Sequence, residues 1–247
     1  QAHMTKFMEA ATASPSSSSE ITLHDFAPGV WLAHRPVKLA PGLRFPCTMT
    51  VLRTEDRRLL IHSPFRIGPT TASSLETLGE VRFVVAPNLF HHLFLPSAAE
   101  AFPQAAVFGP AGLAKKRPEI SRLQAFEDGL PSDWPPEIEV HSIDGAPKVR
   151  ERVLLHRPSR TLVVTDLLFN IEDAKGFAIR SILWAAGTLG GLAKSRITRM
   201  LTRNRGAFDR SVDGILQLDF DRLIMAHGSP IPTGAKARVR QALRADR

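Results

Sequence analysis

The segment EVRFVVAPNLFHHLFLP, Glu80–Pro96, joins a strand pattern to two candidate ligands. Residues 81–85 are mostly apolar and β-branched, which predicts a short buried strand. Pro87 ends this strand because proline has no N–H to donate to a neighbouring strand. His91 and His92 follow, and in an α/β protein the loop after the carboxyl end of a strand commonly holds ligands. The doublet indicates a metal or acid/base site, or alternatively one histidine that caps a turn and one that is solvated.

Three other predicted strands end in the same way. His62 closes the apolar run in RRLLIHSP, Asp166 closes TLVVTDLLFN and His227 closes RLIMAHGSP. Each run is followed by a residue such as Pro, Gly or Asn that stops a strand. If these strand ends meet at one edge, their imidazoles and carboxylate would form a site suited to Zn, Fe or Mn. A site built from several cysteines is excluded, because the chain has only one.

The order of these motifs resembles the metallo-β-lactamase superfamily. LLIHSP is similar to its first strand motif, VVAPNLFHHLFLP to its H-x-H-x-D-H segment, LVVTDLLF to its later aspartate strand and IMAHGSP to its last histidine turn. The resemblance covers most of Val30 to Ile231 and is nearest to a domain family of unknown function within the superfamily. It implies one α/β (α+β) domain folded as a four-layer αββα sandwich, two sheets face to face with helices outside. Hairpin strands followed by alternating helices and strands in both halves agree with this fold.

Departures from the family pattern affect the implied metal chemistry. If His92 takes the last histidine of H-x-H-x-D-H, His91 stands where the family has its aspartate, and Asn88 and Phe90 or their neighbours replace its first two histidines. His62 replaces the aspartate of the first strand motif. The segment GAPKVRE also lacks the histidine that the family has in its GH-x-x-G motif. Glu151 in this segment is a candidate substitute ligand, although a surface salt bridge is the favoured alternative for it. We therefore expect one divalent metal at most.

The predicted ligands and catalytic groups follow from these motifs. The metal is expected to be zinc, with iron or manganese as alternatives, and its candidate ligands are His62, His91, His92, Asp166 and His227. His91 and His62 are also the candidate general bases in place of the absent aspartate. His156, at a predicted hairpin turn, is expected to cap the turn.

Length and composition place the chain among ordinary globular proteins. It has 247 residues, of which 43% are hydrophobic, enough for a substantial core. We expect residues 1–20 to be a tag remnant (QAHM) followed by a flexible leader containing ASPSSSS, and residues 21–247 to form a single domain. Cys47 cannot form an internal disulfide, which together with the lack of a signal-peptide pattern favours a cytoplasmic location.

The charge and hydropathy of the chain indicate which kinds of partner it could bind. The formal net charge is +8, but the cations are scattered except in Lys194–Arg205 and no aromatic residues are interleaved with that run, so nucleic-acid binding is disfavoured. The longest apolar tract, Phe177–Leu192, is too short to span a membrane. We favour a lid over the metal site for this tract, with a buried core helix or an interfacial anchor on anionic lipid as the alternatives.

Three functions remain open at this stage. The first is a mononuclear, metal-dependent, hydrolase-like enzyme acting on a small molecule. The second is an inactive relative that keeps the fold and binds a ligand or partner. The third is a basic membrane- or nucleic-acid-associated module built on Phe177–Arg205. Substrate and oligomeric state are not predictable from the fold.

Overall fold

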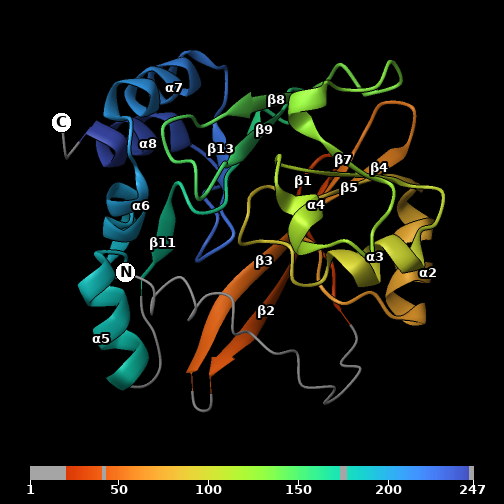
Figure 1. Cartoon of the computed structure of the whole chain (residues 1–247), viewed down its shortest axis with the longest axis horizontal. Coiled ribbons are helices and arrows are strands. Elements are labelled where there is room, and N and C mark those ends of the chain that lie inside the picture. The colour runs from red at the N-terminus through yellow and green to blue at the C-terminus, as the bar shows by residue number, and fades with distance from the viewer. Residues whose placement is uncertain (1–20, 41–42, 173–176, 245–247) are drawn as a thin grey trace.

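The computed structural model describes residues 21–40, 43–172 and 177–244. The predicted tag remnant and leader, residues 1–20, lie outside these ranges. Within them, the strands form two larger sheets and one small one, and most of the helices lie outside the two larger sheets (Figure 1).

The first sheet contains seven strands in the order in which they occur along the chain. They are β1 (His24–Ala27), β2 (Val30–Ala40), β3 (Leu43–Arg53), β4 (Arg58–His62), β5 (Glu80–Val85), β6 (Ala106–Gly109) and β7 (Leu123–Ala125). Strands β1 to β4 pair antiparallel, whereas β4 to β7 pair parallel. Because β4 and β5 are parallel neighbours, the residues that follow both strands emerge at the same edge of the sheet.

The second sheet has the strand order β13–β10–β9–β8, and a small third sheet pairs β11 with β12. The strands are β8 (Ile138–Ser142), β9 (Arg152–His156), β10 (Thr161–Val163), β11 (Phe169–Ile171), β12 (Gly191–Ala193) and β13 (Arg222–Ile224). Strands β10 and β13 are parallel, with Val163 opposite Ile224. The chain therefore leaves both strands at one edge, and Asp166 and His227 follow there.

Helices cover both outer faces of this pair of sheets. The α-helices of the described residues are α2 (Pro69–Leu78), α3 (Leu95–Ala101), α4 (Leu113–Lys116), α5 (Phe177–Ala186), α6 (Arg196–Leu201), α7 (Arg205–Gln217) and α8 (Ala235–Arg244), and η1 (Phe126–Asp128) is a 3₁₀ turn. Helices α2 to α4 lie beside the first sheet, and α7 and α8 lie on the far side of the second (Figure 1). No helix in the described ranges combines the length and the apolar character needed to cross a membrane.

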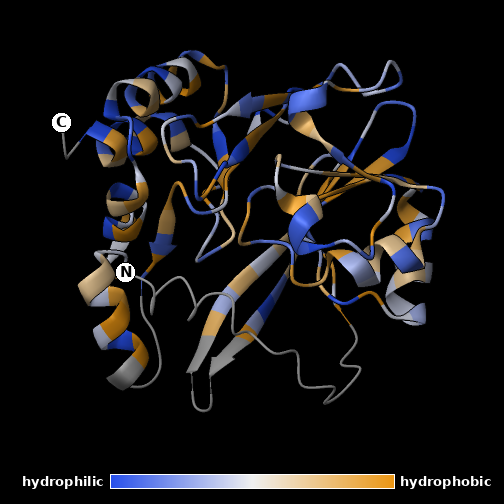
Figure 2. Cartoon of the chain, in the orientation of Figure 1, coloured by the Kyte–Doolittle hydropathy of each residue, from blue (hydrophilic) through white to orange (hydrophobic). Residues whose placement is uncertain are grey.

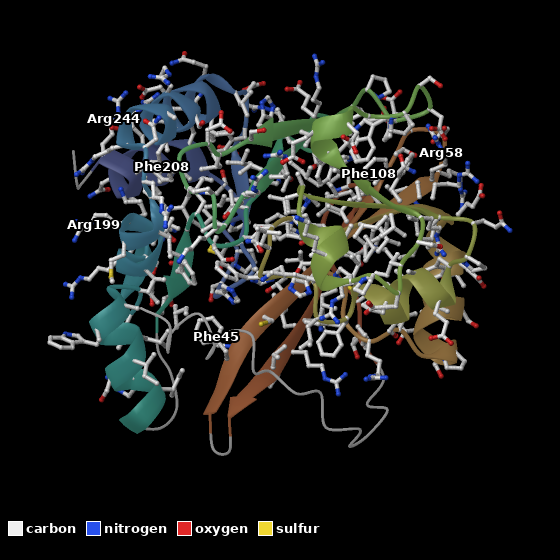
Figure 3. All side chains as sticks on the ribbon, in the orientation of Figure 1. Phe45, Arg58, Phe108, Arg199, Phe208 and Arg244 are labelled. Atoms are coloured by element: carbon white, nitrogen blue, oxygen red, sulfur yellow. The ribbon has the colours of Figure 1, made fainter. Side chains whose placement is uncertain are left out.

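Three apolar layers show how the sheets and helices are stacked. One buries residues such as Ile61 and Leu75 between the first sheet and its helices, and another buries residues such as Phe208 between the second sheet and α7 and α8. The third lies between the sheets and contains Leu154 together with Phe108, which is labelled in Figure 3. Hydropathy follows this pattern, since apolar colour is concentrated on the buried strands (Figure 2). The predicted four-layer αββα sandwich is therefore confirmed.

Side-chain alternation along β4 shows which of its residues face the second sheet. Leu59 and Ile61 belong to the outer layer, whereas Leu60 belongs to the layer between the sheets. Successive side chains of a strand point to opposite faces, so His62 is on the same face as Leu60. The histidine at the end of β4 thus faces the inter-sheet side.

Two local features complete the first sheet and its helices. The N-cap of α2 is Gly68, and Pro69 takes the first helical position, which suits its fixed φ and missing N–H. The stretch from Leu123 to Pro136 is rich in proline and polar residues, as a connecting loop would be. It begins with β7, because Leu123 pairs with Val107 of β6 and extends the parallel part of the sheet.

Candidate metal centre

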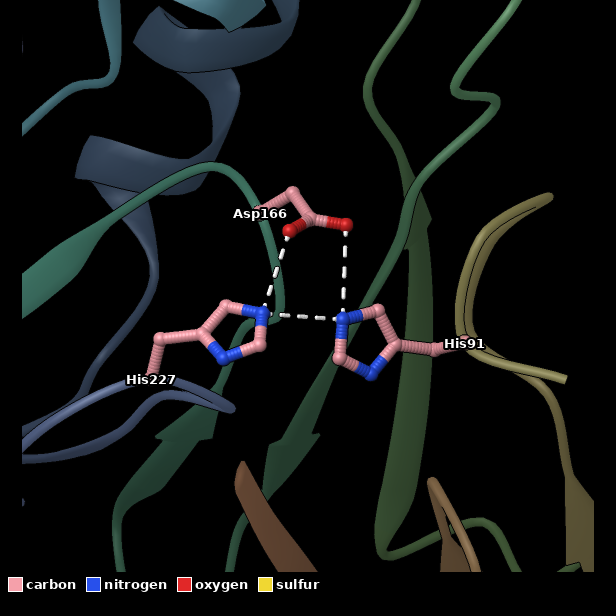
Figure 4. A group of neighbouring side chains, drawn as sticks. All are labelled: His91, Asp166 and His227. Atoms are coloured by element: carbon pink, nitrogen blue, oxygen red, sulfur yellow. Dashed lines mark hydrogen bonds and ion pairs between the residues drawn. The ribbon is translucent and has the colours of Figure 1, made fainter. Parts of the chain in front are cut away.

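Three polar side chains meet at the edge where these strands end (Figure 4). His91 comes from the loop after β5, Asp166 from the segment after β10 and His227 from the segment after β13. Asp166 and His227 are brought together by the parallel pairing of β10 and β13, and His91 reaches them from the other sheet. In the described part of the chain this is the one group of three His, Cys, Asp or Glu ligand atoms close enough to share an ion.

The distances within this triad match a coordination sphere. His91 Nε2 lies 3.0 Å from His227 Nε2 and 3.6 Å from Asp166 Oδ2, and His227 Nε2 lies 3.4 Å from Asp166 Oδ1. In a tetrahedral site with bonds of about 2.0–2.1 Å, neighbouring ligand atoms are about 3.3 Å apart. Two imidazole nitrogens and a carboxylate with this spacing fit a borderline divalent cation such as Zn²⁺.

The far nitrogen of each imidazole is held by a hydrogen bond. His227 Nδ1 donates to the carbonyl of Pro46 at 2.8 Å, so in the neutral ring Nε2 is unprotonated and directed to the triad. His91 Nδ1 lies 2.9 Å from Ser63 Oγ. Ser63 has a φ of 54°, uncommon outside glycine, and its N–H donates to Val85 O at 3.0 Å. Hydrogen bonds of this kind orient metal-ligating histidines.

Aromatic packing and a close backbone contact fix the position of His227. Its ring stacks on Phe169 at 5.1 Å between centroids and meets the edge of Phe45 at 4.5 Å. Gly228, with a φ of 107°, lies against the backbone of Asn170, where a Cβ would collide with the carbonyl oxygen. The glycine in the AHG sequence thus permits the close approach that anchors this turn to β11.

Asn88 connects the β5 loop to the carboxylate. Its Nδ2 donates to Asp166 Oδ2 at 2.6 Å, and its Oδ1 accepts from the N–H groups of Phe90 and His91 at 2.9 and 2.8 Å. The residue is fully buried. In the sequence, Asn88 was interpreted as a residue that stands in place of a family histidine. An Asx-type bond from Asn to the backbone two residues later is a known turn signal that could have indicated its role here.

The ionisation of the triad is set by burial and by its own members. Burial disfavours the charged form of Asp166, but the nearby His91 and the hydrogen bonds from His227 and His91 outweigh it and lower the pKa of the carboxyl. Burial likewise opposes protonation of His227, whereas the bond to Asp166 and the neighbouring Cys47, with Sγ 3.8 Å from Nδ1, raise its pKa to about 10. A cation at Nε2 would therefore displace a proton on binding.

Glu151 is placed to support Asp166 and does not join the triad. Its carboxylate is buried and accepts from the N–H groups of Thr165 at 2.7 Å and Asp166 at 3.0 Å. Burial, and then the neighbouring Asp166 charge, raise the pKa of Glu151 to about 8. The surface salt bridge expected from the sequence is wrong because Glu151 is buried, and as a candidate substitute ligand it is not brought into the triad.

His92 lies outside the triad although it is adjacent to His91. Its Nδ1 accepts a hydrogen bond from Arg117 Nε at 2.8 Å. Burial, followed by the charges of Arg117 and Lys116, lowers the pKa of His92 to about 4. Neighbouring side chains in a loop point in different directions, and here only one member of the doublet is directed to Asp166 and His227.

His62 is buried on the inter-sheet side but is not a member of the triad. Its Nε2 has no hydrogen-bond partner. Burial, with a smaller effect of His91, lowers the pKa of His62 to about 3. The ring is therefore neutral at physiological pH, with a buried polar atom left unsatisfied.

Acidification should destabilise the protein through His62. The folded-state pKa of about 3 lies below the ordinary 6.5, so the unfolded chain binds the proton more readily and stability is lost as pH falls between these values. At pH 5 the loss should be about 2 kcal/mol relative to pH 7.5. Urea unfolding with a chelator present, compared between wild type and His62→Leu, should show the variant gaining this amount relative to wild type on acidification. Parallel pH profiles would contradict the assignment.

The tract predicted as a lid forms α5 and reaches into β12. Ile179 and Leu183 of α5 are buried together with Phe169 and Ile171 of β11. The helix is thus separated from His227 by the Phe169 ring, which stacks on the imidazole. Lid movement over the site stays a prediction.

The remaining predicted turn residue, His156, ties two parts of the fold together. Its Nδ1 lies 2.7 Å from Ser159 Oγ, in hydrogen-bond distance, and its Nε2 donates to the carbonyl of Arg53 at 3.1 Å. The first bond caps the turn between β9 and β10, as expected. The second joins the two large sheets, and both nitrogens are therefore used structurally.

Comparison with known proteins agrees with this fold. Similar solved structures include a metallo-β-lactamase from Pontibacter korlensis (12% identity, TM-score 0.59, 92% of this chain and 100% of the other). Two others are a metallo-β-lactamase from Erythrobacter litoralis (14%, 0.60, 92% and 96%) and FIM-1 from Pseudomonas aeruginosa in its mono-zinc form (12%, 0.56, 92% and 95%). A search of curated protein sequences gives no match.

The model of one family matches residues 30–182, more than half of the chain. This range includes His62, His91, Glu151 and Asp166, whereas His227 follows it. The structural neighbours are too distant in sequence to show more than a shared fold. The chain therefore belongs to the family described as a domain of unknown function, DUF4336, and is a divergent protein of metallo-β-lactamase fold with a candidate metal-binding triad.

Proposed function

We propose that this protein is a mononuclear, metal-dependent, hydrolase-like enzyme that acts on a small molecule. The observation that carries the proposal is the triad of His91, Asp166 and His227, whose ligand atoms are spaced as a single cation requires. Zinc is the favoured ion, with iron or manganese as alternatives, and a bound zinc ion supplies Lewis acidity and lowers the pKa of water.

The surrounding residues would hold the ligands in place. The Pro46 carbonyl and Ser63 orient the two imidazoles, and Asn88 holds one carboxylate oxygen. This arrangement leaves both Nε2 atoms and the Asp166 oxygens directed to one point. Because Ser63 and Asn88 are buried in the fold, they need little reorganisation when a cation binds.

His62 is better suited to form a hydrogen bond than to remove a proton at neutral pH. A general base is most effective when its pKa is near the working pH, and the pKa of His62 is about 3. Its Nε2 is nevertheless a buried polar atom without a hydrogen-bond partner, on the inter-sheet side. We therefore propose that His62 positions a polar group of the substrate or a water molecule.

One metal per chain is the expected stoichiometry. His62 and His92 lie outside the triad, and Glu151 is occupied by backbone N–H groups, so the described residues provide a single cluster of ligands. Native mass spectrometry after loading with zinc and removal of excess ion should give one equivalent. Two tightly held ions would contradict the mononuclear assignment and would require ligands that the triad does not supply.

Turnover should depend on the same ion. The purified protein can be assayed against chromogenic lactam, lactone, thioester and phosphodiester substrates, before and after treatment with a chelator and after zinc is restored. Loss and recovery of hydrolysis of at least one class would support the enzyme. Tight binding of one ion without turnover of any class would favour the inactive, ligand-binding alternative.

A further inference from the structure

Exposed apolar side chains are concentrated at one end of the molecule, on α5 and α6. Among the described residues, four large hydrophobic side chains are strongly exposed: Trp184 (72%), Met200 (65%), Leu130 (42%) and Ile182 (41%). Three of them belong to these two helices. Single exposed apolar residues are ordinary on protein surfaces. A group of them that includes a largely exposed tryptophan indicates a site of contact with a membrane or with another protein.

The two helices form a continuous surface. Arg196, at the start of α6, donates from Nη1 to the carbonyl of Ala185 at 3.4 Å, and its side chain lies against Gly187 just after α5. In Figure 1 the helices follow one another along the same side of the molecule. We call residues 177–205 on these helices and their connection the α5–α6 surface.

Helix α5 has apolar side chains on its solvent-facing side as well as on its buried side. Ile179 and Leu183 are buried, while Arg180, Ile182 and Trp184 are exposed. Most surface helices place charged side chains on the side that faces solvent. Here the solvent-facing side carries two large apolar residues, so α5 has an apolar outer face in addition to its core face.

The charge of the α5–α6 surface has a single sign. Residues 177–208 contain six basic residues and no Asp or Glu. The basic residues are Arg180, Lys194, Arg196, Arg199, Arg203 and Arg205. On α6, Met200 lies near Arg196 and Arg199, and Arg203 follows the end of the helix; all three arginines are exposed. Figure 3 shows Arg199 projecting outward. Apolar side chains among cations match the acyl chains and anionic headgroups of a lipid surface.

We propose that the α5–α6 surface docks on an anionic membrane surface, with Trp184, Ile182 and Met200 inserted at the headgroup boundary. The exposed arginines of this surface would contact anionic lipid headgroups. Because no described helix can cross a membrane, this contact is peripheral. The proposal stands on exposure and charge and does not depend on the metal centre.

Docking would place the metal centre close behind the lipid contact. The inner side of α5 packs on Phe169 and Phe45, and the other sides of these rings contact His227. The α5–α6 surface and the triad are therefore separated by one layer of side chains. An apolar or amphipathic small molecule that partitions into membranes is the substrate class that this placement favours.

Vesicle flotation tests the proposal directly. The full chain should float with vesicles of phosphatidylcholine containing about 30 mol% phosphatidylglycerol, and only weakly with phosphatidylcholine alone. Trp184→Ser combined with Met200→Ser should weaken partitioning by about tenfold or more, and Arg199→Glu combined with Arg203→Glu should have a similar effect on anionic vesicles. Brominated lipid should quench tryptophan fluorescence in the wild type and not in Trp184→Ser, which retains Trp31 and Trp134.

Matched variants separate docking from general surface effects. Leu130→Ser removes the one strongly exposed large hydrophobic side chain of the described residues outside the α5–α6 surface, and Arg66→Glu reverses an exposed charge elsewhere. Both should bind vesicles nearly as wild type does. Equal weakening by these controls, or wild type that does not float with anionic vesicles, would overturn the proposal. So would a wild-type dimer that Trp184→Ser/Met200→Ser converts to monomer without any vesicle binding.

Discussion

Asp166→Asn should reduce the affinity for zinc by more than about a hundredfold while leaving the protein folded. Loss of even an outer hydrogen-bond partner of a ligand commonly costs about 10–100-fold in metal affinity, and loss of the anionic ligand itself should cost more. The amide has nearly the same shape, and its oxygen can still accept from Asn88 Nδ2 in place of Oδ2. Competition with a chromogenic chelator gives the affinity, and circular dichroism reports the fold.

A matched aspartate and a second ligand make this test decisive. Asp219 is exposed and paired with Arg160, so Asp219→Asn should bind zinc as wild type does. His91→Gln removes a ligand carried by a loop and should also lose the metal. If Asp166→Asn and His91→Gln both held zinc as tightly as wild type, the triad would not be the metal site.

Short local patterns predicted an α/β or α+β domain and the positions of its strand ends, whereas the four-layer sandwich was implied by the resemblance to the metallo-β-lactamase superfamily. Apolar runs stopped by Pro or Gly located the strand ends, and the parallel pairing of β10 with β13 then brought Asp166 and His227 to one edge. Strand pairing acts on the backbone and depends weakly on the identity of single side chains. The convergence of residues far apart in the sequence was therefore accessible without coordinates.

The choice between His91 and His92 was not accessible in this way. Both follow the same strand and have the same chemistry, and their roles differ only because Ser63 contacts one ring and Arg117 contacts the other. These partners come from separate parts of the chain. A local pattern cannot specify such contacts, which depend on the direction of a loop after the sheet has formed.

Glu151 shows the same limit for a buried carboxylate. Its position between GAPKV and the β9 strand suggested a ligand or a surface residue, because charged side chains are rarely buried without a partner. The partners are backbone N–H groups at the end of β10, which carry no sequence signal of their own. Only tertiary packing shows that this carboxylate holds the segment on which Asp166 lies.

Glu151→Ala should therefore destabilise the protein strongly. The substitution removes the acceptor of two buried N–H groups, and each buried donor left without a partner costs about 1–3 kcal/mol. We expect the free energy of unfolding to fall by about 2–6 kcal/mol, measured by urea denaturation with a chelator present. A small domain with a total stability of about 5–15 kcal/mol would lose a large part of it.

Glu151→Gln gives a graded control for this effect. Glutamine keeps the length of the side chain and one carbonyl oxygen, so it can accept from one of the two N–H groups, while its amide nitrogen faces the other. The expected loss is about half that of Glu151→Ala. Zinc affinity should also fall by about 10–100-fold in Glu151→Ala, because the backbone of Asp166 is no longer held, and this can be tested below the unfolding transition. A variant with unchanged stability and unchanged zinc affinity would mean that the hydrogen bonds from Thr165 and Asp166 to Glu151 do not support the metal centre.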